Sequence, residues 1–229
     1  RVKQIVDASG GGEMTQRTLL AIGLFSMLVA ALFLLGTPDF KRMLAYSSVE
    51  HMGILAVGAA LGGLGIWAAL FHVWTNSLTK GALFLSAGNL RRAAGTASQN
   101  GASGMTWCAP LSARLFVTGL FAITACPPFG PFFSELLVVR TAFSTGSIFT
   151  AAWFLACLLL AFFGLSRLVF DIVDGRPRAA ARASASHFRE TPGVILPPLA
   201  FLGLSLWVGL ATPPWLGRAW TAAANLFLP

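Results

Sequence analysis

The sequence has 229 residues, of which 56% are hydrophobic and 10% charged, and its net charge at pH 7 is +8. A soluble domain carries about 25% charged residues, so the composition excludes a soluble globular protein and indicates an integral membrane protein surrounded by the lipid bilayer. The positive charge does not indicate nucleic-acid binding, because Lys and Arg lie in short connectors between apolar stretches, as in the cytoplasmic loops of membrane proteins.

The apolar stretches predict an all-α fold, a polytopic bundle of transmembrane helices, since a helix needs about 20 residues to cross a bilayer. Residues 1–17 are polar, and we expect a loop or an amphipathic end that follows a region missing from this chain. The predicted spans are residues 18–36, 43–64, 66–90, 111–143 and 148–170. An arginine-rich cytoplasmic connector covers residues 171–191. Residues 192–229 contain the last transmembrane helix and an interfacial C-terminus with Trp215, Arg218 and Trp220.

The fourth span is longer than one helix needs and contains Cys-Pro-Pro-Phe-Gly-Pro at residues 126–131. A continuous helix cannot accommodate these prolines, so we expect two half-helices joined by an unwound segment. Interrupted helices at membrane depth are tolerated only where protein or water covers the free backbone groups. In transporters they mark the transport path.

The distribution of charge predicts which connectors share a side of the membrane. The connectors at 37–42, 91–110 and 171–191 hold most of the positive loop charge, and those at 62–66 and 144–147 hold none. This alternation places the charged connectors in the cytoplasm, provided that 111–143 counts as one interrupted crossing. Arg1, Lys3 and Arg17 lie on the otherwise uncharged side, so the agreement with the rule is imperfect.

A polar stripe runs along the third span, where His72, Asn76 and Lys80 follow one another at intervals of four residues. In a helix they share one face. A lysine in mid-membrane costs a few kcal/mol or more, which favours a group that exchanges protons. His72 is a natural relay partner, and Asn76 can hold a water molecule. The alternatives are a lysine that snorkels to the headgroups and a histidine bonded to a carbonyl.

Further ionisable residues lie on the neighbouring spans. Glu135 follows the predicted break, as a proton-exchanging carboxylate or as a cap of the second half-helix. Glu50 and His51 lie about two turns into the second span, as relay residues or as a polar patch against a neighbouring subunit. Lys41 is a relay residue or a cation among the headgroups.

No cofactor site is predicted. The sequence has no phosphate loop, no dinucleotide fingerprint, no Cys-x-x-Cys and no iron–sulfur spacing. Cys108, Cys126 and Cys157 show no pairing or metal-ligand spacing, so we expect no disulfide and no metal. The physical interpretation is a conduit for protons or cations, without a catalytic site of its own.

Three motifs resemble those of antiporter-like subunits, the proton-pumping membrane subunits of respiratory complex I, group 4 hydrogenases and Mrp-type sodium/proton antiporters. Residues 39–53 resemble the family's Asp-x-Lys-Arg-x-Leu-Ala-Tyr-Ser signature. Residues 72–88 are similar to its His-x-x-x-His-x-x-x-Lys helix, and residues 127–135 to its broken helix. Within the family, the Tyr-Ser-Ser-Val-Glu-His-Met-Gly and Pro-Pro-Phe-Gly stretches are most similar to hydrogenase-4 component F and its formate-hydrogenlyase relatives.

The resemblance implies inverted repeats of five helices, each with one broken helix. Residues 18–170 would be the second repeat, followed by one further helix, and the first repeat would precede this chain. The resemblance also implies that Lys41, His72, Lys80 and Glu135 line a central hydrophilic axis. One departure is Asn76, which stands where the family has a second histidine.

The expected function is therefore a proton-translocating membrane subunit of a complex I-like or hydrogenase-4-like oxidoreductase in a bacterial inner membrane. Its expected partners are other membrane subunits, which would perform the redox chemistry. Two alternatives stay open. One is a cation/proton antiporter subunit of the Mrp type, which works without redox partners and moves sodium as well as protons. The other is a truncated subunit that only packs in the complex.

Overall fold

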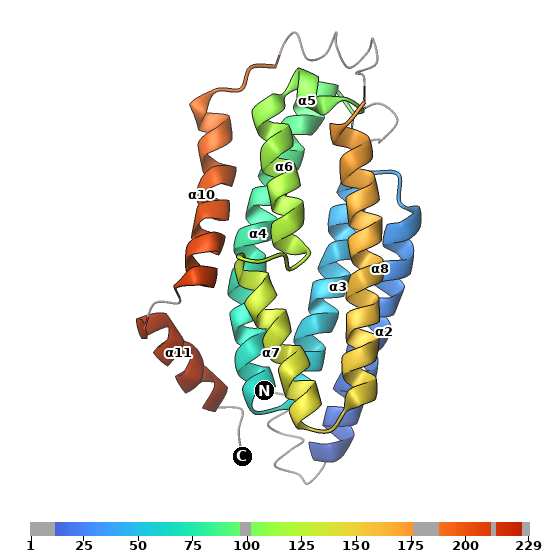
Figure 1. The fold of residues 1–229 in the computed structure, drawn as a ribbon, viewed down its shortest axis with the longest axis vertical. Coiled ribbons are helices and arrows are strands. Elements are labelled where there is room, and N and C mark those ends of the chain that lie inside the picture. Colours follow the sequence, from blue (N-terminus) through green and yellow to red (C-terminus); the bar gives the residue numbers. More distant parts are fainter. Residues whose placement is uncertain (1–11, 97–101, 176–187, 212–213, 226–229) are drawn as a thin grey trace.

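The computed structural model describes residues 12–96, 102–175, 188–211 and 214–225. These residues form helices and connecting turns, with no β-strand among them. The long helices run side by side along the long axis of the molecule (Figure 1). This arrangement confirms the predicted all-α bundle.

The helices follow one another as α2 (Gly12–Gly36), α3 (Phe40–Leu61), α4 (Leu64–Ala94), α5 (Met105–Cys108), α6 (Pro110–Ile123), α7 (Gly130–Ser144), α8 (Ile148–Val173), α10 (Pro192–Leu210) and α11 (Pro214–Asn225). By length and composition, α2, α3, α8 and α10 can each cross a membrane. The more polar α4 has 31 residues, a length of about 46 Å. Helices α6 and α7 follow one another alongside it (Figure 1).

Helix α2 begins earlier than predicted, because residues 12–17 are helical rather than part of a loop. Two side-chain contacts, each between residues four positions apart, accompany this start. Arg17 pairs with Glu13 at 3.1 Å, and the Thr18 hydroxyl donates to the Met14 carbonyl. Pairs at this spacing stabilise a helix. The rest of the predicted loop, residues 1–11, lies outside the described residues.

Capping residues explain the other differences at helix ends. Helix α3 begins at Phe40, ahead of the apolar span predicted from residue 43, at the cap position that Asp39 indicates in the sequence. The Asp39 carboxylate accepts a hydrogen bond from the backbone N–H of Lys41 at 2.7 Å. Helix α4 continues past residue 90 to Ala94 and ends at Gly95, whose φ of 71° is left-handed. The connector predicted at 91–110 therefore starts with a helical turn, and it also contains α5.

The predicted break in the fourth span is confirmed, with α6 ending at Ile123 and α7 beginning at Gly130. Some of its backbone groups pair locally, as in the 2.9 Å bond from Cys126 N–H to the Phe121 carbonyl. Helix α10 covers the segment so closely that a Cβ at Gly209 would lie 2.6 Å from the Pro128 carbonyl oxygen. Protein thus shields the unwound backbone, which membrane depth requires.

The connectors alternate between the two ends of the bundle (Figure 1). The C-terminal ends of α2, α4 and α8 lie at one end, and the α3–α4 and α7–α8 turns lie at the other. Which end faces the cytoplasm stays a prediction. Residues 176–187, most of the arginine-rich connector, lie outside the described residues.

Helix α11 leans away from the bundle axis at the chain's end (Figure 1). It attaches through Trp220, which is buried edge-on against Phe71 with ring centroids 4.9 Å apart. Arg218 is exposed. The interfacial position predicted for this segment stays a prediction, and its last residues, 226–229, lie outside the described residues.

A buried polar cluster between three helices

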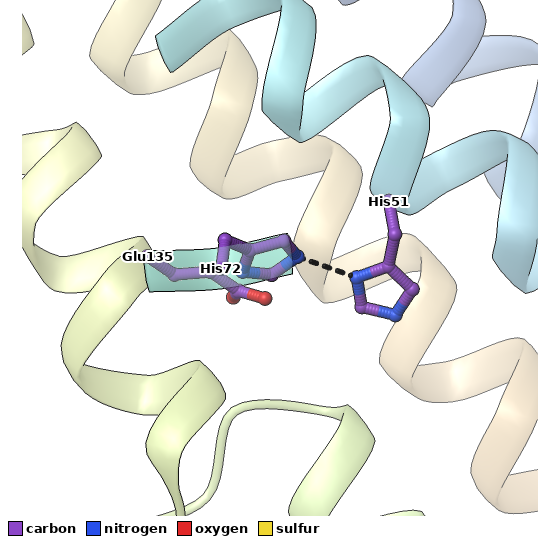
Figure 2. A group of neighbouring side chains, drawn as sticks. All are labelled: His51, His72 and Glu135. Carbon is purple, nitrogen blue, oxygen red and sulfur yellow. Dashed lines mark hydrogen bonds between the residues drawn. The ribbon is translucent and has the colours of Figure 1, made fainter. Parts of the chain in front are cut away.

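Helices α3, α4 and α7 bring a chain of hydrogen bonds into the interior of the bundle. His51 Nδ1 on α3 lies 3.0 Å from His72 Nε2 on α4. His72 Nδ1 lies 2.8 Å from the Ser134 hydroxyl on α7. All three side chains are at most 2% exposed. Residues far apart in the sequence therefore form one continuous polar chain. Figure 2 shows its His51–His72 bond.

The last bond of this chain sets its direction. The Ser134 hydroxyl donates to the Pro131 carbonyl at 2.8 Å, so its oxygen accepts from His72 Nδ1–H. A neutral imidazole carries one proton, which leaves a lone pair on His72 Nε2 to accept from His51 Nδ1–H. The chain thus runs from His51 toward the start of the second half-helix, and His51 Nε2 is left without a partner.

Glu135 joins the same cluster from the next position on α7. Its carboxylate lies beside the His72 imidazole (Figure 2), and it is only 4% exposed. Its Oε1 atom has no hydrogen-bond partner. The capping alternative is wrong, because α7 begins at Gly130 and no side chain caps it.

Lys80 lies in the middle of α4 and directs its amine toward α3. Nζ donates to the Ser48 hydroxyl at 2.5 Å and to the Ser47 hydroxyl at 3.4 Å. Both hydroxyls donate in turn to the Leu44 carbonyl. A snorkelling lysine would extend to a helix end, so this geometry contradicts the snorkelling alternative.

Glu50 on α3 is a second buried carboxylate near these groups. It is 3% exposed and interacts electrostatically with both Lys80 and Glu135. Among the described residues, no carboxylate forms an ion pair with Lys80 within 4.0 Å. The burial of Glu50 and His51 contradicts the alternative of a surface patch for a neighbouring subunit.

The remaining predicted residues differ in their position. Asn76 lies on α4 between His72 and Lys80, is 4% exposed, and its Oδ1 atom has no hydrogen-bond partner. Lys41 is exposed in the first turn of α3, beside Arg91 at the edge of a groove. The structure thus brings His51, His72 and Glu135 together, with Glu50 and Lys80 within electrostatic reach, and it places Lys41 in an exposed turn.

Residues 5–161 match the family described as NADH:quinone oxidoreductase/Mrp antiporter, TM. The chain belongs to this family. It is a membrane antiporter-like subunit of the complex I, hydrogenase and Mrp group, and hence an integral, multi-pass membrane protein.

Two curated relatives support the assignment. A hydrogenase-4 component F homologue of Methylacidiphilum infernorum is 33% identical over 93% of this chain and 44% of the relative. NADH-quinone oxidoreductase subunit N of Desulforudis audaxviator is 30% identical over 89% of this chain and 42% of the relative. The chain therefore spans less than half the length of these relatives.

The fold agrees with a solved structure of the same group. A chain of the Mrp complex from Dietzia sp. superimposes with a TM-score of 0.83 at 23% identity, over 96% of this chain and 49% of the other. At that identity the likeness shows the fold.

Two hydroxyl residues of this antiporter-like subunit were missing from the predicted site. Ser48 holds the Lys80 amine, and Ser134 orients His72. A signal was present, because Ser48 lies in the signature at 39–53 and Ser134 directly precedes Glu135. Serines are common at helix starts and in packed helices, so composition alone does not single them out.

Proposed function

We propose that this subunit moves protons through the membrane along the buried cluster of Lys80, Glu50, His51, His72 and Glu135. The observation that carries the proposal is the contact of titratable groups from three helices at membrane depth, since such groups are rare in spans and mark ion paths. Among these groups, His51 and His72 are joined by a hydrogen bond of 3.0 Å, and a proton can pass along it without a moving carrier.

The geometry suggests how a proton would pass through the histidine pair. A proton that arrives at the unpartnered His51 Nε2 lets the Nδ1 proton cross 3.0 Å to His72 Nε2. His72 then carries a proton on each nitrogen, and the adjacent Glu135 carboxylate stabilises this cation. Ser134 keeps the imidazole oriented throughout.

Lys80 would act as the group that exchanges charge with the rest of the path. Its amine keeps hydroxyl partners on α3 whether it is charged or neutral, so a change of protonation needs no rearrangement of the backbone. Glu50 interacts electrostatically with Lys80, and a proton shift between them would alter the charge felt by the histidines. Lys41, which is exposed, would remain outside this buried path.

We propose further that the subunit belongs to a complex I-like or hydrogenase-4-like assembly in a bacterial inner membrane. The similarity to a hydrogenase-4 component F homologue and to an NADH-quinone oxidoreductase subunit supports this choice. Partner subunits would carry the redox cofactors. The Mrp alternative is supported by the fold of the Mrp complex chain, and proton flux that requires sodium in vesicles would favour it.

Replacement of Lys80 by Met tests the proposed path. We expect the complex to assemble and proton transport in membrane vesicles to fall to background, because the variant cannot exchange a proton at this position. Lys41→Met is the matched control, since it removes an exposed lysine from the same subunit, and it should retain transport. Undiminished transport in Lys80→Met would contradict the proposal.

A further inference from the structure

His51, His72 and Glu135 present the side chains that bind zinc in proteins. Their ligand atoms, one from each residue, all lie within 4.8 Å of one another, and all three residues are buried. Two histidines and a glutamate form a known zinc ligand set that leaves a fourth position for water. The three ligands come from α3, α4 and α7, which is why no spacing in the sequence indicated a metal site.

We propose that these three residues bind a single divalent transition-metal ion, with Zn²⁺ the best fit, in place of the shared proton. The donors are two nitrogens and a carboxylate oxygen, a set that suits zinc and other borderline ions rather than Mg²⁺ or Ca²⁺. The site is distinct from any redox cofactor site, because zinc carries no redox chemistry.

The two histidine nitrogens already lie close to the separation that a zinc ion requires. Zinc bonds of 2.0–2.1 Å in tetrahedral geometry separate neighbouring ligand atoms by about 3.3 Å. The His51 Nδ1 to His72 Nε2 distance is 3.0 Å, so the imidazoles are already close to this separation. The Glu135 carboxylate has to approach further, and rotation about its side-chain bonds provides that movement.

Two further observations point to a ligand at this position. The first is the Ser134 hydroxyl, which fixes His72 Nδ1 and directs Nε2 into the cluster; metal-bound histidines are oriented in this way by a partner on the other nitrogen. The second is the buried Glu135 Oε1 atom, which has no hydrogen-bond partner. Buried polar atoms are rarely left unpaired without a reason.

The charges around the site act in opposite directions. Glu50 interacts electrostatically with Glu135, and its carboxylate would favour a bound cation. Lys80 interacts with both histidines and, when charged, would oppose one. Cys157 on α8 also lies within electrostatic reach of Glu50. Removal of the Lys80 charge should therefore strengthen metal binding.

The consequence for transport rests on the proposed function. A metal ion would occupy the atoms through which protons pass, so Zn²⁺ would inhibit proton transport. Binding moves the His51 proton from Nδ1 to the unpartnered Nε2 and needs an ionised Glu135, and metal affinity therefore weakens as the pH falls. The Glu50 and Lys80 charges, which face the site, would modulate this dependence.

The test is Zn²⁺ binding to the purified complex that contains this chain, measured by competition with a chromophoric chelator. His72→Gln and Glu135→Gln should each lose one bound ion or weaken its binding by at least about tenfold. Glu13→Gln, which removes an exposed carboxylate, is the matched control and should bind as wild type. Gln retains polarity and hydrogen bonding, and size-exclusion chromatography checks assembly.

Lys80→Met separates this proposal from the proposed function. It should stop proton transport and still bind Zn²⁺ at least as tightly as wild type. Wild-type binding unaffected by the His72 and Glu135 substitutions would overturn the metal site and leave the proton path untouched. The visible absorption spectrum with Co²⁺ in place of Zn²⁺ is a second measurement, because tetrahedral Co²⁺ has an absorption band in the visible range. Absence of that band in the wild type would also contradict the site.

Discussion

Asn76 is the residue at which this subunit departs from the family pattern it resembles. It lies on α4 one turn after His72 and one turn before Lys80, buried and with an unpartnered amide oxygen. An amide cannot carry a proton, but it can hold a water molecule that does. A proton relay through this turn therefore depends on a water molecule held by the amide rather than on a titratable side chain.

This dependence leads to a prediction for two substitutions. Asn76→Leu should lower proton transport strongly, because the apolar side chain removes the polar site for water. It should not destabilise the protein, since loss of a buried unpaired amide is nearly neutral or stabilising. Asn76→His, which restores the family's residue, should retain or raise transport. Proton flux in vesicles checks both, and full transport in Asn76→Leu would show that no water is needed there.

The sequence predicts the individual polar residues better than their contacts. His72, Asn76 and Lys80 share a helical face by spacing alone, and the burial of a lysine among apolar residues marks it as unusual. The contact between His51 and His72 could not be predicted, because it depends on how α3 packs against α4. The alternatives for Glu50 and Glu135 likewise required the packing of three helices to be resolved.

At the scale of helices, the break between α6 and α7 positions the site. It starts α7 at Gly130, so Ser134 and Glu135 lie in its first turns, beside His72. Prolines predict this break directly. The close approach of α7 to α4 depends on Gly130, where a Cβ would overlap the Thr75 side chain.

Gly130→Ala should therefore destabilise the protein by about 1–3 kcal/mol, the usual cost of overpacking a tight contact. The displaced half-helix should also weaken proton transport, because Ser134 and Glu135 move with it. Gly88→Ala is the matched control on α4. Its added methyl group meets nothing within 4 Å, and Ala is the better helix former. Thermal unfolding in detergent distinguishes the two, and equal stability would contradict the packing argument.

Helix ends were predicted less well than helix positions, for local reasons. The Asp39 cap starts α3 earlier than the apolar pattern does, and the Glu13–Arg17 pair carries α2 into a polar stretch. Lys41 is the instructive residue. Its motif resembles that of an axis residue, but the cap places it in the first, exposed turn of α3.

At the scale of the whole molecule, the bundle, its connectors, the broken helix and the last span follow from the apolar pattern, the charges and the prolines of the sequence. The chain spans less than half the length of its curated relatives. A subunit that only packs in its complex would need the same apolar surfaces. It would have no need of two buried histidines and a buried glutamate whose ligand atoms lie within 4.8 Å of one another.

The combined variant Lys80→Met/Glu135→Gln distinguishes these roles most directly. It neutralises a titratable group on α4 and another on α7. Met and Gln are close in size to Lys and Glu, so the packing between the helices is retained. Proton transport by the complex in vesicles is the measurement, with assembly checked by size-exclusion chromatography. We expect an assembled complex that moves no protons. Normal proton transport with both groups neutralised would contradict the proton path and assign this subunit a packing role.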